Sequence, residues 1–115
     1  MIRICVSESE RRLVNFSVLG HGEHDVCVSV SALVSAFVQY SKDFSHYRCG
    51  CLLDLKSYDR GNVSFILRFD SEKSKNEYLY GTQGLMTGLE LFAETFPKEI
   101  SLTVCRDVTH LKEEL

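Results

Sequence analysis

The order of the hydrophobic patterns along the chain restricts its fold more than any other property. Alternation of apolar and polar residues is typical of strands with one buried face, whereas apolar residues at spacings of three and four are typical of helices. The patterns follow the order strand, strand, helix, strand, strand, helix, strand. This order predicts an α+β fold, a two-layer α/β sandwich with two helices packed on one face of a small, mainly antiparallel sheet of four or five strands.

The expected strands form two hairpins and one final strand. They cover residues 2–7, 13–19, 49–56, 62–70 and 100–104. A polar turn over residues 8–12 joins the first two strands, and Tyr58-Asp59-Arg60-Gly61 joins the third and fourth. Residues 109–115 are expected to form a polar, frayed tail.

Residues 26–41 fit two patterns. Val26, Val28 and Val30 alternate with small polar residues, as in a strand. A helical stripe fits equally well, and its members are Val26, Val30, Leu33, Phe37 and Tyr40. The segment is longer than a typical strand, and Asp25 is a residue type that caps helices. We therefore interpret it as a helix, although β-branched residues disfavour one.

A second helix is predicted to begin at Ser71 or Ser74 and to end before Pro97. Three glycines in this stretch would weaken a solvent-exposed helix by roughly 1 kcal/mol each relative to alanine. They are Gly81, Gly84 and Gly88. Close packing would explain them, and the small residues expected on the first helix are Ala32, Ser35 and Ala36.

Length and composition restrict the class of protein. The 115 residues, taken as one domain over 1–115, are enough for a single core. The formal net charge of −3 argues against direct nucleic-acid binding, which requires a basic surface. No apolar run is long enough to span a membrane, and no secretory signal is apparent, so we expect a cytoplasmic protein with free thiols at its five cysteines.

The residues best suited to chemistry surround a glycine-rich loop that precedes the first helix. Cys27 would lie in the first helical turn, where backbone amides and the helix dipole favour a thiolate. His21, between Gly20 and Gly22, is placed to accept the thiol proton, as a Cys–His nucleophilic pair requires. Backbone amides at the helix start, including that of Cys27 or its successor, are candidates to bind an oxyanion.

Two neighbours have possible supporting roles. Asp25 suits a helix N-cap, and it could also orient an imidazole as the third member of a triad does. Ser31 lies one helical turn beyond Cys27, where its hydroxyl could donate a hydrogen bond to a thiolate or a substrate carbonyl. It is equally well explained as a small packing residue.

The same residues also fit a core position or a metal site. Cys27 beside Val26 and Val28 would suit an inert, buried thiol. His21, His24 and Cys27 recur at three-residue steps and are ligand types that zinc accepts, but the glycines argue against the continuous helix that this spacing needs. Cys49-Gly50-Cys51 has no partner pair of ligands, so metal binding is the weakest hypothesis, and no cofactor is implied.

The segments Gly20-His21 and Asp25-Val26-Cys27-Val28-Ser29-Val30-Ser31 resemble the ribosomal-processing cysteine proteases called Prp. The resemblance extends over the whole chain in size and order of elements, and it implies a compact, homodimeric two-layer α/β domain. It further implies removal of a short N-terminal extension from the large-subunit ribosomal protein numbered twenty-seven. By position, His21 would be the general base and Cys27 the nucleophile, with Asp25 and Ser31 in support.

One departure from the family favours an alternative function. Only Gly22-Glu23-His24 separates His21 from Asp25, whereas this interval is usually longer in the family. A long loop can act as a lid on a bound substrate. The alternative is therefore a non-catalytic module that binds a ribosomal protein or an assembly partner.

Overall fold

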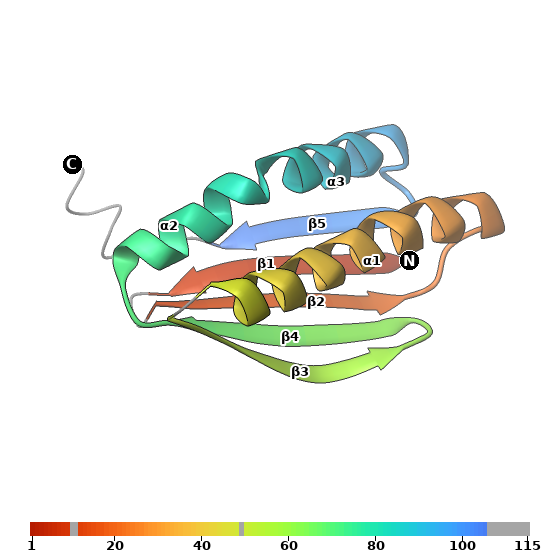
Figure 1. Cartoon of the computed structure of the whole chain (residues 1–115). Helices are drawn as coiled ribbons and strands as arrows, with labels where there is room; N and C mark the ends of the chain where they lie inside the picture. Colours follow the sequence, from red (N-terminus) through yellow and green to blue (C-terminus); the bar gives the residue numbers. More distant parts are fainter. Residues whose placement is uncertain (10–11, 49, 106–115) are drawn as a thin grey trace, which may run out of the picture.

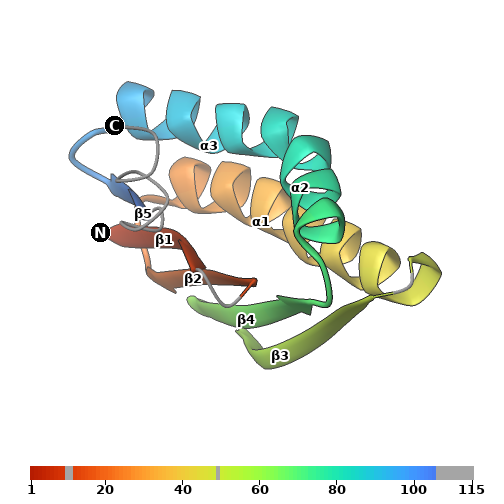
Figure 2. The same ribbon diagram turned by 90° about the vertical axis from the view of Figure 1, so that its left-hand side faces the viewer.

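The computed structural model describes residues 1–9, 12–48 and 50–105. The strands are β1 (Ile2–Ser9), β2 (Leu13–Gly20), β3 (Cys51–Asp59), β4 (Asn62–Phe69) and β5 (Ile100–Cys105). The helices are α1 (His24–Tyr47), α2 (Glu72–Gly81) and α3 (Gln83–Thr95). Figures 1 and 2 show all three helices on one face of the sheet. The predicted α+β fold with helices on one face of a small sheet is confirmed.

The five strands form one sheet in the order β3-β4-β2-β1-β5. Neighbouring strands are antiparallel except for β1 and β5, which run parallel because the chain crosses over the sheet through α2 and α3. The predicted hairpin turn is tight, since Asp59 pairs with Asn62 across Arg60 and Gly61. Gly61 has a φ of 78°, a conformation that glycine adopts without strain.

The core lies between the sheet and the helices. Alternate residues of the strands point towards the helices, and Ile4, Phe16 and Phe65 are each 1% exposed. The Phe16 ring stacks between Phe37 of α1, at 4.8 Å, and Phe65 of β4, at 5.0 Å. Burial of such large apolar side chains is the main stabilising contribution to a fold of this size.

Helix α1 confirms the helical interpretation of residues 26–41 and extends it at both ends. Its buried residues include Val26, Val30, Val34 and Phe37, so the valines at positions 26 and 30 that also fitted a strand belong to one helical face. Tertiary burial of this face outweighs the low helix propensity of β-branched residues.

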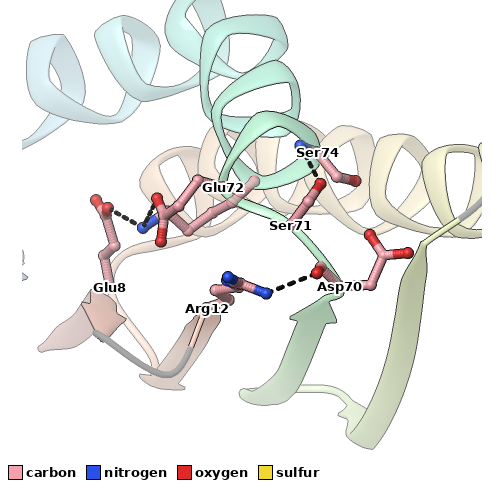
Figure 3. Close-up of polar contacts among 7 residues, drawn as sticks. Glu8, Arg12, Asp70, Ser71, Glu72 and Ser74 are labelled. Atoms are coloured by element: carbon pink, nitrogen blue, oxygen red, sulfur yellow. Dashed lines mark hydrogen bonds and ion pairs between the residues drawn. The ribbon is translucent and has the colours of Figure 1, made fainter.

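The second predicted helix is divided in two. Thr82 caps both α2 and α3, with φ −93° and ψ 1°, and its N–H donates to the Tyr78 carbonyl oxygen. Ser71 is the N-cap of α2, because its hydroxyl oxygen accepts a hydrogen bond from the Ser74 N–H at 3.1 Å. Figure 3 shows this cap beside the contact of Arg12 with the Asp70 carbonyl oxygen.

The glycines of this region pack differently from the prediction. A Cβ on Gly88 would lie 2.9 Å from Leu33 of α1, and one on Gly81 would overlap the Tyr40 hydroxyl, whereas Gly84 has open space around it. Ala32, Ser35 and Ala36 are not the residues that meet these glycines, so their expected contact was wrong. The larger Leu33 and Tyr40 face α2 and α3 instead.

Candidate active site

A cavity of about 260 Å³ lies where the start of α1 meets the end of β2 and the β3–β4 turn. His21, Cys27 and Ser31 line it, and Tyr58–Gly61 form one wall. Its remaining lining is mostly apolar and includes Val30, Val34 and Val63. The structure therefore brings three of the four predicted site residues to one cavity.

Cys27 is half-buried in the first turn of α1, and its sulfur contacts the preceding loop. The Gly22 N–H donates to Cys27 Sγ at 3.1 Å, and the thiol donates to the Gly22 carbonyl oxygen at 3.3 Å. The loop between β2 and α1 is so short that its backbone folds against the sulfur. The sulfur thus has both a backbone donor and a backbone acceptor from Gly22.

His21 follows the end of β2 and is exposed. Gly20, with φ 103°, turns the chain out of the sheet and donates its N–H to the Gly61 carbonyl oxygen at 3.0 Å. The imidazole lies directly against Gly61, since a Cβ there would overlap the ring. The His21 carbonyl oxygen accepts a hydrogen bond from the Met1 ammonium at 2.9 Å.

His21 and Cys27 share the cavity without a direct contact between their polar atoms. Within the described part of the chain, no hydrogen bond joins the thiol and the imidazole, and the thiol is paired with Gly22 instead. Catalytic hydrogen bonds often form only when a substrate is bound.

Asp25 and Ser31 occupy different positions relative to the cavity. Ser31 is exposed and lines it, one helical turn from Cys27. Asp25 is exposed outside the lining, and its predicted N-cap role was wrong, because α1 begins at His24 and Glu23 is its N-cap. The Asp25 carboxylate lies in the first turn, where it interacts favourably with the helix dipole.

One predicted oxyanion donor is also excluded. The Cys27 N–H donates to the Glu23 carbonyl oxygen at 2.8 Å, as the first turn of α1 requires. It is therefore not free to bind a substrate oxygen. The Gly22 N–H is likewise engaged, because it donates to Cys27 Sγ at 3.1 Å.

Sequence reasoning missed Glu99, which lies in the turn before β5. The Glu23 N–H donates to Glu99 Oε2 at 2.9 Å, across 76 positions of sequence. The same oxygen is 2.5 Å from the place that a Cβ on Gly22 would occupy. No local pattern could indicate this contact, since it depends on how β5 pairs with β1.

The metal hypothesis finds no support in the described residues, which contain no cluster of three or more potential His, Cys, Asp or Glu ligands. His24 is the first residue of α1, so His21 does not share its helix.

The four described cysteines are free, as expected, and Cys49 lies outside the described residues. Among them, Cys51 is buried, and burial together with Asp70 raises its pKa to about 11.

Two further features concern the rest of the molecule. No helix in the described ranges is long and apolar enough to cross a membrane. A second cavity, of about 470 Å³, lies between α2, α3 and the ends of β1 and β5, and Tyr78, Met86 and Val104 are part of its lining. None of the predicted site residues reaches it. The smaller cavity is therefore the candidate active site.

Comparison with known proteins identifies the fold. No protein-family model and no curated protein sequence matches the chain. The chain resembles the ribosomal processing protease Prp from Staphylococcus aureus in two solved structures, one with a substrate peptide (20% identity) and one with a covalently linked product peptide (19% identity). In both, the TM-score is 0.62, and the match covers 90% of this chain and 99% of the other.

A protein of Streptococcus mutans, SMU.848, has the same architecture. It is 14% identical, with a TM-score of 0.62, and the match covers 92% of this chain and 95% of that one. At these identities the likeness establishes a shared fold.

Proposed function

We propose that the chain is a cysteine endopeptidase that removes an N-terminal extension from the large-subunit ribosomal protein numbered twenty-seven. The observation that carries the proposal is the position of Cys27. Its sulfur lies at a helix N-terminus, accepts a backbone N–H from Gly22 and shares a cavity with His21. This is the environment in which a thiol becomes a nucleophile.

The proposed reaction proceeds through an acyl-enzyme. His21 accepts the proton of the Cys27 thiol, and the thiolate attacks the carbonyl carbon at the end of the extension. The C–N bond breaks, His21 returns the proton to the leaving amine, and the extension remains as a thioester on Sγ. Water then hydrolyses the thioester and regenerates the thiol.

The neighbouring residues have distinct proposed roles. Ser31 lines the cavity one turn from Cys27 and supports a substrate carbonyl or the thiolate through its hydroxyl. Asp25 acts through its charge in the first turn of α1, because it does not reach the cavity lining. The solved Prp structures with a substrate peptide and with a covalently linked product peptide support this class of chemistry on the shared fold.

The remaining parts of the proposal concern the setting of the reaction. We propose a cytoplasmic homodimer that needs no cofactor and acts on a protein partner without direct contact to nucleic acid. The mild negative charge of −3 suits a basic ribosomal protein as substrate.

A specific observation favours one alternative, a non-catalytic module that binds the ribosomal protein. The Cys27 thiol is paired with Gly22, and the loop that precedes it is short.

Incubation of the ribosomal protein with wild type and with Cys27→Ala, measured by intact mass, decides between the peptidase and the binding module. Loss of a defined N-terminal fragment with wild type alone supports the peptidase, whereas an uncut protein that co-purifies with both forms supports the binding module.

A further inference from the structure

The loop between β2 and α1 is held from outside by Glu99. The Glu99 carboxylate accepts the Glu23 N–H at 2.9 Å, and the next N–H back along the chain, that of Gly22, donates to Cys27 Sγ at 3.1 Å. Two successive backbone donors thus point at two acceptors, the carboxylate and the sulfur. The two N–H groups are joined through the Gly22 Cα, and the planar peptide unit that carries the Glu23 N–H also carries the Gly22 carbonyl oxygen, which accepts the Cys27 thiol at 3.3 Å. Holding this unit against Glu99 fixes one side of Gly22 and so limits the directions that the Gly22 N–H can take.

Glu99 is itself on a rigid support. Its carbonyl oxygen accepts the Ile2 N–H at 2.7 Å, which joins it to the first strand of the sheet. Its own N–H donates to the Phe96 carbonyl oxygen at 3.0 Å, at the end of α3. The carboxylate therefore projects from a backbone that is held on both sides.

Gly22 is the residue type that this contact requires. A Cβ at this position would lie 2.5 Å from Glu99 Oε2, closer than real Cβ contacts come. The missing side chain lets the carboxylate approach the loop backbone. The contact between the Glu99 carboxylate and the Glu23 N–H therefore depends on both Glu99 and Gly22.

We propose that Glu99 is a positioning residue that holds the Gly22 N–H at the Cys27 sulfur and thereby sets the nucleophilicity of that thiol. For peptide cleavage this inference rests on the proposed function. For the reactivity of the thiol, the inference is independent of the proposed function, because alkylation depends on the thiolate and does not depend on peptidase activity. Glu99 thereby keeps the short loop between β2 and α1 in one conformation.

Several ionisable groups besides Glu99 lie near the Cys27 sulfur or its loop, and the test leaves these residues unsubstituted. His21, Tyr58, Asp59 and Arg60 line the cavity with Cys27. The Met1 ammonium contacts the His21 carbonyl oxygen, and Glu23 belongs to the loop itself. None of these is changed in the variants below.

The test is the rate of Cys27 alkylation by iodoacetamide as a function of pH, resolved by peptide mass. The forms compared are wild type, Glu99→Ala, Glu99→Gln and, as a matched control on the exposed side of α3, Glu94→Ala. Loss of a hydrogen bond to an anion predicts an alkylation rate about tenfold lower in Glu99→Ala at pH 7. At about pH 10, above the ordinary pKa of a thiol, all forms should react at similar rates.

The conservative variant separates positioning from general stability. The amide oxygen of Glu99→Gln accepts the same N–H, so its profile should match wild type within about twofold. Gly22→Ala displaces the Glu99 carboxylate without changing Glu99 itself, so it should lower the alkylation rate as Glu99→Ala does. It replaces Glu99→Ala in the test if Glu99→Ala does not fold. Unchanged alkylation in both Glu99→Ala and Gly22→Ala would overturn the proposal.

The experiments distinguish a failure of the positioning role of Glu99 from a failure of the proposed peptidase function. If wild type cleaves no ribosomal protein but its alkylation still depends on Glu99, the positioning role stands and the peptidase assignment falls. If cleavage occurs while both substitutions leave the alkylation profile unchanged, the positioning role falls.

Discussion

Replacing Gly61 by alanine perturbs the proposed base without touching the nucleophile. Gly61 has a φ of 78°, and its Cα lies against the His21 imidazole, so that a Cβ would overlap the ring carbon Cε1 and nitrogen Nε2. The turn has little room to retreat. The Gly61 carbonyl oxygen accepts the Gly20 N–H at 3.0 Å, and the Tyr58 hydroxyl contacts Ser35 Oγ at 3.4 Å.

Two effects of this substitution have separate magnitudes. An alanine in the left-handed region destabilises the folded protein by about 1–2 kcal/mol, which a domain with roughly 5–15 kcal/mol of stability withstands. To reach ordinary contact distance the imidazole has to move by roughly 1 Å. A displacement of about 1 Å at a reacting group lowers the rate by about 100-fold. We therefore predict a folded protein with kcat/KM about 100-fold lower.

The assay is cleavage of a peptide that spans the processing site, compared with the free energy of unfolding in urea. Gly50→Ala is the matched control, because Gly50 has a φ of 87° and a Cβ there would overlap the Asp70 carboxylate, yet Gly50 does not line the cavity. Both variants should lose similar stability, but only Gly61→Ala should lose activity. Equal kcat/KM values for the two variants would refute the reasoning.

Three further predictions concern stability, each measured by urea unfolding. Gly84→Ala should stabilise the protein by about 0.5 kcal/mol, because α3 has open space at this position; destabilisation would mean that the position is packed. Tyr78→Phe should destabilise by about 1 kcal/mol, since it removes the buried hydroxyl that pairs with Ser41 Oγ at 2.7 Å; no change would show that the pair contributes nothing. Burial and Asp70 raise the pKa of Cys51 to about 11, so the unfolded thiol ionises first as the pH rises above 9, and wild type should lose roughly 2 kcal/mol by pH 11. Cys51→Ala should lack this part of the pH dependence, and parallel pH profiles would contradict the assignment.

Much of the fold followed from hydrophobic periodicity. The two hairpins, the helix over residues 26–41 and the last strand all appear, because each buries one face against the same core. The division of the second helix at Thr82 was not predicted, because the apolar spacing continues through it. Local patterns could not predict the parallel pairing of β1 with β5 either, because this pairing depends on the path of the chain across the sheet.

The candidate site was predictable where it is local in sequence. His21, Cys27 and Ser31 reach one cavity because a short loop joins a strand end to a helix start. Asp25 was misplaced as the N-cap, since the helix begins two residues earlier than the apolar pattern suggested. Glu99 and Gly61 were missed, because they meet the loop only through tertiary contacts.

The most direct test of the central claim is to look for the extension attached to Cys27. Wild type is mixed with the ribosomal protein, quenched in acid within one turnover and measured by intact mass and peptide mapping, with Cys27→Ala and Cys5→Ala as controls. We predict that wild type and Cys5→Ala gain the mass of the extension as a thioester on Cys27, and that Cys27→Ala gains none. Release of the extension by wild type without any adduct, together with equal cleavage by Cys27→Ala, would contradict the account.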